Sequence, residues 1–241
     1  MPGRVPLGRA LSKLGILSRS QAVAAIRAGR VRVNGRTVVD PAALVVPERV
    51  RIALDDQPRR RAAWRTILLY KPRGVVTTRR DPQGRRTVFD VLRDAPSPLT
   101  PAEIEPLIAV GRLDLATSGL LLLTTDTRLA QWISDPENQV RRLYVVTVRG
   151  RVTEEMAGRM PAAVRVVKAS NRETHLVVEL REGKNRQVRR LFDAIARPVS
   201  RLKRAALGGL ELGSLEPGGF RELSPGELER AFPGAPATSG A

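Results

Sequence analysis

Two apolar runs separated by a turn-rich stretch constrain this chain more than any other feature. The run LIAV ends at Val110, and the second run, Leu120–Thr124, begins ten residues later. Uninterrupted apolar runs of this kind are typical of buried strands. Between them, Gly111 and Thr117-Ser118-Gly119 permit sharp backbone turns. We therefore expect Asp114, which lies in this turn, to sit at the mouth of a sheet.

The position of Asp114 makes it a candidate for chemistry. A partly buried carboxylate stays ionised only beside a cation or several hydrogen-bond donors, and Arg112 lies two residues away. An aspartate at a turn is also a common cap or turn residue. The pattern alone leaves both interpretations open.

The charge of the chain points to a polyanionic partner. Its formal net charge is +18, and the basic residues extend from Arg4 to Arg230. Nucleic acid is the expected ligand, although charge alone does not separate RNA from DNA, and an arginine-rich solvated surface is the alternative.

Several kinds of site are not expected. The chain has no cysteine, and its one histidine, His175, lies in the alternating strand pattern ETHLVVEL. We therefore expect no disulfide and no metal site. There is no apolar run of membrane-spanning length and no signal-peptide pattern, so we expect a soluble, cytoplasmic protein without a membrane partner.

Residues 4–54 have the pattern of a small module. Apolar residues at helical spacing predict a helix from Leu7 to Leu14, and a second helix follows through Ala22–Ile26. Asn34-Gly35 between two short alternating runs predicts a hairpin. No acidic residue precedes Asp40, so we expect the cations of the module to contact RNA phosphates: Arg9, Lys13, Arg19, Arg27, Arg30 and Arg32.

The string LSKLGILSRSQAVAAIRAGRVRVNGRTVVDP resembles the S-four-type (alpha-L) RNA-binding domain, first known from a small-subunit ribosomal protein. In that family the second helix and the hairpin hold structured RNA through its backbone. The resemblance covers nearly the whole module.

After the module, the composition predicts a linker over residues 55–65, a larger domain over 66–232 and a disordered tail over 233–241. The larger domain alternates strand patterns with amphipathic segments. The predicted strands are Thr66–Tyr70, Arg142–Arg149, Ala163–Val167, His175–Leu180, Ser200–Ala205 and Gly219–Leu223, and the predicted helices are Thr127–Ser134, Lys184–Ala196 and Pro225–Phe232.

The larger domain resembles the rRNA pseudouridine synthases of the RsuA/RluB group. The likeness rests on YKPRGVVTTRRDPQGRRTVFDVL, GRLDLATSGLLLLTTD, RRLYVV, EGKNRQVRRLFDAI and RPVSRLKR, and with the module it spans residues 5–226. It implies an α+β fold in which a mixed, largely antiparallel central sheet is flanked by helices. It also implies a monomeric enzyme without a cofactor, whose partner is ribosomal RNA or a ribosome-assembly particle.

The resemblance also implies roles for individual residues. Asp114 matches the catalytic aspartate, Arg112 an arginine that helps displace the target base, Tyr144 the active-site tyrosine, Arg189 the arginine that pairs with the aspartate, and Leu202 an apolar residue of the pocket. Lys71 and Arg73, on the turn KPRG, are expected to bind substrate.

This chain departs from the family pattern at a few other positions. The family commonly has Asn at Tyr70, Lys at Arg142, and Gly-His at Ala196-Arg197. These departures bear on substrate fit and leave the five matched positions intact.

The expected function is therefore conversion of a specific uridine in large-subunit (23S) rRNA to pseudouridine, with Asp114 as the catalytic carboxylate. Three alternatives remain: the same reaction on small-subunit (16S) rRNA, a non-catalytic RNA-binding assembly protein, and a DNA-binding protein. A hydrolytic glycosidase is disfavoured, because that chemistry normally needs two flanking carboxylates and the motif of Asp114 has no second acid.

Overall fold

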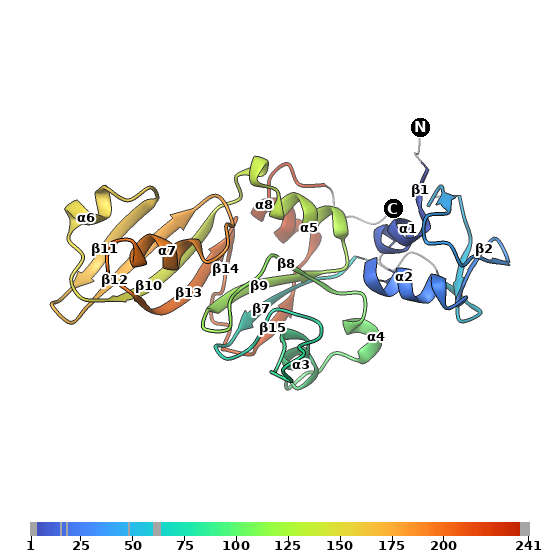
Figure 1. Ribbon diagram of the computed structural model, residues 1–241, viewed down its shortest axis with the longest axis horizontal. Coiled ribbons are helices and arrows are strands. Elements are labelled where there is room, and N and C mark those ends of the chain that lie inside the picture. The colour runs from blue at the N-terminus through green and yellow to red at the C-terminus, as the bar shows by residue number, and fades with distance from the viewer. Residues whose placement is uncertain (1–3, 15, 18, 48, 60–63, 237–241) are drawn as a thin grey trace.

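The computed structural model describes residues 4–14, 16–17, 19–47, 49–59 and 64–236. The molecule is elongated, with a small N-terminal module at one end and a long sheet with its helices making up the rest (Figure 1). Helix α1 of the module contacts helix α5 of the larger domain. The two parts therefore meet through helices.

The N-terminal module packs two helices against a four-stranded antiparallel sheet of order β3-β2-β5-β6. The helical spacing seen in the sequence buries Leu7, Leu11 and Ile26 in one cluster with Val31. Its elements are β1 Val5–Pro6, α1 Leu7–Lys13, α2 Arg19–Arg27, β2 Val31–Val33, β3 Arg36–Thr37, β4 Leu44–Val45, β5 Ile52–Leu54 and β6 Gln57–Arg59.

The hairpin predicted at Asn34-Gly35 is confirmed, with φ of 52° and 83° at the two turn residues. Positive φ at both positions is the geometry that matches the twist of paired strands.

Part of the span predicted as a linker belongs to the small sheet. Gln57–Arg59 pairs with Ile52–Leu54, and the turn between them places Asp55 and Asp56 at φ of 53° and 59°. Aspartate tolerates this left-handed conformation, so a polar pair that predicts a loop forms a tight turn instead. Residues 60–63 lie outside the described part of the chain.

The larger domain contains a nine-stranded sheet of order β11-β12-β10-β13-β9-β7-β15, with β14 paired to β13 and β8 to β9. Its strands are β7 Thr66–Lys71, β8 Ile108–Val110, β9 Ser118–Thr124, β10 Arg142–Arg149, β11 Ala163–Ala169, β12 Glu173–Leu180, β13 Val199–Leu207, β14 Leu210–Glu211 and β15 Phe220–Glu222. Its helices are α3 Val88–Arg93, α4 Pro101–Ile104, α5 Thr127–Ser134, η1 Pro136–Asn138, α6 Glu154–Gly158, α7 Gln187–Asp193 and α8 Pro225–Ala231.

Strand pairing in this sheet is antiparallel except where β13 meets β9. This confirms the predicted mixed, largely antiparallel sheet and the α+β class. The parallel contact has two paired positions, Lys203 with Ser118 and Arg204 with Gly119. It joins the two halves of the sheet and is called the seam below.

The apolar run of β9 is buried on both faces of the central half of the sheet. Leu120 and Leu122 belong to a cluster with residues of α5 and α8, while Leu121 and Leu123 belong to a cluster with residues of α3 and α4. Side chains alternate across a strand, so four consecutive leucines supply both layers. A third cluster fills the other half of the sheet beneath α6 and α7.

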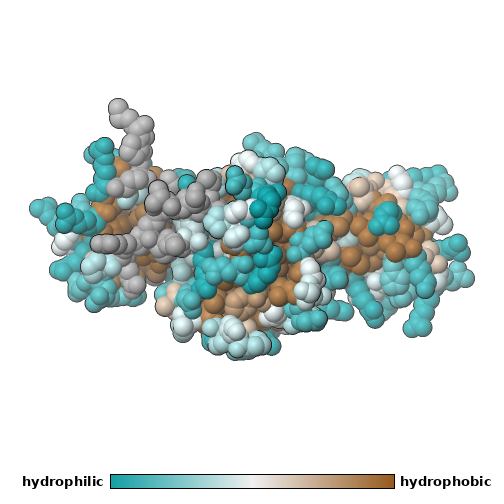
Figure 2. Space-filling model, turned by 180° about the vertical axis from the view of Figure 1, so that it is seen from behind, coloured by the Kyte–Doolittle hydropathy of each residue, from teal (hydrophilic) through white to brown (hydrophobic). Residues whose placement is uncertain are grey.

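One end of the sheet leaves apolar side chains uncovered. Val145 and Val167 are 38% and 57% exposed. Figure 2 shows the corresponding apolar area at the end of the molecule away from the N-terminal module.

Helix α7 is shorter than predicted. It runs over Gln187–Asp193, whereas the apolar spacing predicts Lys184–Ala196. Arg186 and Ala196, which flank it, have φ of 47° and 53°. Left-handed residues interrupt a right-handed helix, and apolar spacing alone does not reveal them.

The span predicted as a disordered tail, 233–241, begins with residues that pack against the domain. The Ala235 N–H donates to the Phe232 carbonyl at 3.0 Å, and Ala235 packs against the cluster that contains Phe232. Residues 237–241 lie outside the described part of the chain.

Candidate active site

Asp114 lies in the loop between β8 and β9, at the seam end of β9. Three contacts hold this loop. The Thr117 N–H donates to the Asp114 carbonyl at 3.0 Å, and the Gly74 N–H donates to the Leu115 carbonyl at 2.8 Å. The Thr77 hydroxyl donates to the Leu113 carbonyl at 2.9 Å. Asp114 is therefore carried by a loop braced against the Lys71–Gly74 turn.

Lys71 lies inside this brace and is fully buried. Its Nζ donates to the carbonyls of Pro72 and Thr117 at 2.9 and 2.7 Å. Burial lowers the pKa of Lys71 to about 8, against an opposing effect of the Asp114 charge. The Lys71 side chain thus holds the end of the Asp114 loop from inside the protein. The sequence predicts that Lys71 binds substrate, but its side chain has no exposed surface. Arg73, on the same turn, is exposed.

The cation that pairs with Asp114 in the described part of the chain is Arg186, with Nη1 at 3.5 Å from Oδ2. The sequence predicts Arg189 in this role. Arg189 instead donates from Nη1 to the Val199 carbonyl at 3.1 Å and from Nη2 to the Ala116 carbonyl at 3.3 Å.

Arg189 still acts on this region through its charge. Burial lowers the pKa of Arg189, Arg186 lowers it further, and Asp114 raises it. Arg186 lies just before α7 in a left-handed conformation, and its side chain contacts Asp114. Arg189 lies in the first turn of the helix and binds the Ala116 carbonyl, two residues beyond the aspartate. Two guanidinium groups therefore surround the Asp114 loop.

A cavity of about 350 Å³ opens beside Asp114. Four residues named from the sequence line it together: Arg112, Asp114, Tyr144 and Leu202. They come from the β8–β9 loop, β10 and β13, and the seam brings these elements into contact. The segment before α7 closes another side, and the further lining residues are Gly111, Leu113, Thr117, Ser134, Arg142, Leu180, Glu182, Gly183, Lys184, Asn185, Arg186, Gln187, Val188 and Arg204.

The cavity contains two buried arginines that sequence reasoning did not assign to the site. Arg142 and Arg204 are 7% and 3% exposed, and neither forms an ion pair within the described residues. Arg204 was within reach of the sequence, because it lies two residues after Leu202 and alternate residues of a strand share a face. Arg142 was noted only as a departure from the family pattern.

Within the described residues, no group of three or more His, Cys, Asp or Glu side chains is arranged to hold a metal ion. The groups that line the cavity include the carboxylates of Asp114 and Glu182, the Tyr144 phenol, the Lys184 ammonium group and several guanidinium groups. The cations suit the binding and electrostatic stabilisation of a polyanion or of a developing negative charge.

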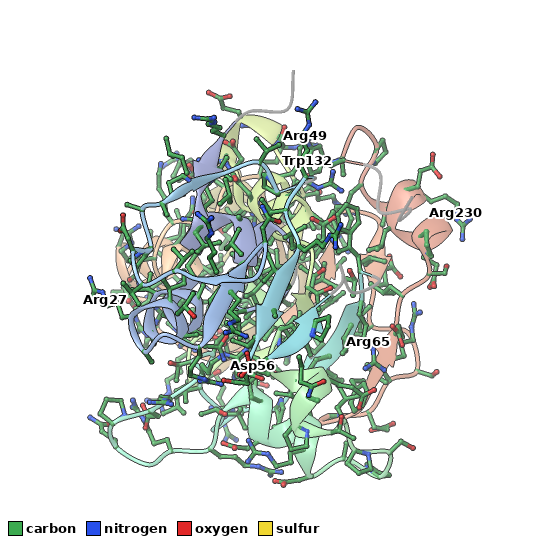
Figure 3. All side chains as sticks on the ribbon, turned by 90° about the vertical axis from the view of Figure 1, so that its right-hand side faces the viewer. Arg27, Arg49, Asp56, Arg65, Trp132 and Arg230 are labelled. Carbon is green, nitrogen blue, oxygen red and sulfur yellow. The ribbon has the colours of Figure 1, made fainter. Side chains whose placement is uncertain are left out.

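The cations predicted to bind RNA lie on the N-terminal module. Arg9, Arg19 and Arg27 are exposed, and Figure 3 shows Arg27 projecting away from the module. Arg30 forms an exposed ion pair with Asp55 at 2.5 Å, and Arg32 forms one with Asp56 at 2.9 Å. The side chain of Lys13 lies outside the described part of the structure. Exposed ion pairs contribute little to stability, so Arg30 and Arg32 can exchange their carboxylates for phosphates.

The fold and the site define a class of protein: a basic nucleic-acid-binding module joined to a domain with an enzyme-like cavity. Comparison with known proteins gives the family. The RNA pseudouridylate synthase family matches residues 65–194, and the S4 domain matches residues 5–50. The chain belongs to the RNA pseudouridylate synthase family, in its RsuA/RluB group. It is therefore an enzyme that isomerises uridine in RNA to pseudouridine.

Individual relatives agree over almost the whole chain. An uncharacterized RNA pseudouridine synthase of Aquifex aeolicus (strain VF5) is 35% identical over 95% of this chain and 94% of its own. Ribosomal large subunit pseudouridine synthase B of Bacillus subtilis (strain 168) is 33% identical over 93% and 94%. A solved pseudouridylate synthase structure superposes with a TM-score of 0.62 at 26% identity, over 94% of this chain and 99% of that one.

Of the expectations about membranes, the structure tests only whether a helix of this chain could span one. Within the described residues, no helix has the length and apolar character needed to cross a bilayer.

Proposed function

We propose that this enzyme isomerises a specific uridine of large-subunit (23S) ribosomal RNA, and that Asp114 is its catalytic carboxylate. The observation that carries the proposal is the cavity in which Asp114, Tyr144 and Leu202 meet. The name of the Bacillus subtilis relative supports the choice of ribosomal subunit. We further propose that it acts as a cytoplasmic monomer on rRNA or on an assembling particle.

The reaction breaks the bond between ribose C1′ and uracil N1, turns the base and joins C1′ to C5. One proton leaves C5 and one is gained at N1, so the change is an isomerisation without net oxidation. Asp114 faces the cavity as the carboxylate that attacks the ribose or the base, or that removes a ribose proton. Arg186, with Nη1 at 3.5 Å from Oδ2, pairs with this carboxylate and orients it. Arg189 holds the loop that carries Asp114 through its hydrogen bond to the Ala116 carbonyl.

The detached base must stay in place while it turns. Tyr144 and Leu202 come from the neighbouring strands β10 and β13, and both line the cavity. An aromatic ring and an apolar side chain form a surface along which a planar base can rotate without escaping.

The target uridine must first leave its stack in the RNA, which costs a few kcal/mol. Arg112 is exposed at the rim of the cavity and is placed to fill the space that the base leaves. Arg73, also exposed, and the cations of the S4 domain supply backbone contacts.

The test compares rRNA from cells that lack the gene with rRNA from cells that carry either wild type or Asp114→Asn, with pseudouridine mapped at single-nucleotide resolution. We expect one 23S site to disappear in the deletion and to return with wild type alone. The purified Asp114→Asn enzyme should bind the RNA with unchanged affinity and lose turnover, because the substitution removes the charge and preserves the shape.

Asp193→Asn is the matched control, since Asp193 is an exposed acid at the end of α7. It should restore the site. Restoration by Asp114→Asn contradicts the catalytic role, and a site that disappears from 16S rRNA contradicts the choice of subunit.

A further inference from the structure

Arg204 carries more unused hydrogen-bonding capacity than a buried side chain normally has. It lies on β13, is 3% exposed, and donates from Nε to the Leu120 carbonyl at 2.7 Å. A guanidinium has five N–H donors. Within the described residues the four on Nη1 and Nη2 have no acceptor, and Nη2 is completely buried. Buried polar groups are almost always paired, so this exception calls for a function.

The neighbouring buried arginine shows the contrast. Arg142 donates from Nη1 to the Val140 carbonyl at 2.7 Å and from Nη2 to the Ile133 carbonyl at 3.1 Å. Arg142 is thus held by the protein at both ends, as a structural residue is. Burial lowers the pKa of Arg142, Tyr144 raises it, and the positive charge of Arg204 lowers it further. Two buried cations therefore line one cavity, and neither forms an ion pair among the described residues.

The position of Arg204 places this unpaired guanidinium at the active site. Arg204 lines the same cavity as Asp114, Tyr144 and Leu202. It is paired with Tyr144 across β10 and β13, and it follows Leu202 by two residues on one strand face. Arg204 thus borders the space in which the base turns under the proposed function.

The reaction produces negative charge on the base. When the bond between C1′ and N1 breaks, its electron pair leaves with uracil, and the charge spreads over N1, O2 and O4. When C5 bonds to C1′, the pair returns to that new bond and the charge disappears. A fixed cationic donor that meets the charge only in this interval lowers the barrier without holding the substrate more tightly.

We propose that Arg204 is a catalytic residue that donates hydrogen bonds from its Nη atoms to a uracil carbonyl oxygen and stabilises the base while it is detached. The guanidinium keeps its protons throughout, so the balance of the isomerisation is unchanged. The inference rests on the proposed function in one respect, namely that the target base occupies this cavity.

The first measurement is the single-turnover rate on a substrate RNA for wild type, Arg204→Gln and Arg204→Lys. Removal of one donor to a developing anion typically lowers a rate by about 10²–10³-fold. We expect a loss of this size in Arg204→Gln and a smaller one in Arg204→Lys, which keeps the charge. The RNA dissociation constant and the thermal unfolding midpoint should stay close to those of wild type. Lys203→Gln is the control, because Lys203 precedes Arg204 on the strand and does not line the cavity; it should keep the wild-type rate.

The second measurement separates contact with the base from a structural role. The target uridine is replaced by 2-thiouridine or 4-thiouridine, because sulfur is a poorer hydrogen-bond acceptor than oxygen. We expect one of these replacements to slow wild type and Lys203→Gln and to have little further effect on Arg204→Gln. Such non-additivity is the signature of two groups in contact.

Three results overturn the proposal. The first is an unchanged single-turnover rate in Arg204→Gln, and the second is that each thio-substitution slows Arg204→Gln by the same factor as wild type. The third is that neither thio-substitution slows the wild-type enzyme. The last result needs no variant, so it applies even if the loss of the Leu120 contact prevents folding. Asp114→Asn is assayed beside these proteins. If it retains turnover, the proposed function fails; if it is inactive and the Arg204 results are negative, the inference about Arg204 fails alone.

Discussion

Lys71 shows how a single residue can matter to an active site without touching the substrate. It is a fully buried cation with two carbonyl partners, and one of them, Thr117, ends the turn that contains Asp114. Its charge is partly balanced by Asp114, but burial dominates and its pKa is lowered to about 8. Burying the charged lysine therefore lowers the free energy of unfolding at neutral pH, while its hydrogen bonds hold the loop.

This cost predicts a pH dependence. The unfolded chain returns Lys71 to its ordinary pKa of 10.5, so between about pH 8 and 10.5 the unfolded state binds more protons than the folded state. The free energy of unfolding of wild type, relative to Lys71→Met, should therefore rise with pH in this window. The full rise is about 3 kcal/mol, and no change from this source is expected below pH 8.

Urea unfolding of both proteins at a series of pH values from about 7 to 10.5 measures the difference directly. Because all other groups are common to the two proteins, subtraction isolates Lys71. If the free energies of unfolding of the two proteins change in parallel with pH, the pKa of Lys71 is not lowered in the folded state, which contradicts the structure.

At the scale of elements, the seam between β9 and β13 determines whether the site exists. It has two paired positions, and it holds Asp114 on one half of the sheet against Tyr144 and Leu202 on the other. Gly119 lies at its tightest point, with φ of 114°, and a Cβ there would stand 2.6 Å from the Arg204 backbone nitrogen. Both the conformation and the space require glycine.

Gly119→Ala should therefore lower the free energy of unfolding by about 3 kcal/mol or more, since backbone strain and a backbone collision act together. Chemical denaturation measures the loss. Gly84→Ala is the matched control, because Gly84 also has a positive φ, of 67°, but a Cβ at this position would meet no atom within 4 Å. It should lose about 1 kcal/mol. Equal losses in the two variants contradict the close approach at the seam.

The helices and strands differ in how well the sequence pattern predicts them. The patterns place α5 and β10 at Thr127–Ser134 and Arg142–Arg149, and the structure has the same bounds. Helices α3 and α4 were not predicted, although Thr87 with Asp90 and Thr100 with Glu103 form capping boxes that are readable from spacing. Each of these helices has at most six residues, too few for apolar periodicity to stand out.

At the scale of the whole molecule, the arrangement of the two domains brings some of the cations behind the net charge of +18 together at their junction. Arg9 and Arg19 of the S4 domain line a hollow of about 620 Å³ against α5 of the catalytic domain, which Thr127 and Gln131 also border. With Arg128 of α5, three arginines from the two domains therefore border this hollow, and we expect RNA phosphates to bind there.

The double variant Arg9→Gln/Arg19→Gln should weaken RNA binding uniformly across sequences. Its plot of log affinity against log salt concentration should be shallower by about 2, since each phosphate contact contributes about 0.9 to the slope. Arg159→Gln is the control, because Arg159 lies beyond α6 at the far end of the molecule and pairs with Glu155 (Figure 1). An unchanged slope in the double variant excludes these two cations from the RNA contact.

The sequence by itself determined the family, the order of the domains and the main candidates of the site. The resemblance to the pseudouridine synthases named Asp114, Tyr144, Leu202 and Arg112, and all four line one cavity. The local patterns of strands and turns had already placed Asp114 in a turn beside a buried strand and Tyr144 on a strand.

Only the tertiary structure decided which side chains meet. Arg186 rather than Arg189 contacts Asp114, Lys71 points inward, and Arg204 lines the cavity with donors unpaired within the described chain. The physical reason is that these outcomes depend on a left-handed residue before a helix, on which strand face is covered, and on a seam between strands more than about 80 residues apart. Such contacts are long-range, and no local pattern in the sequence encodes them.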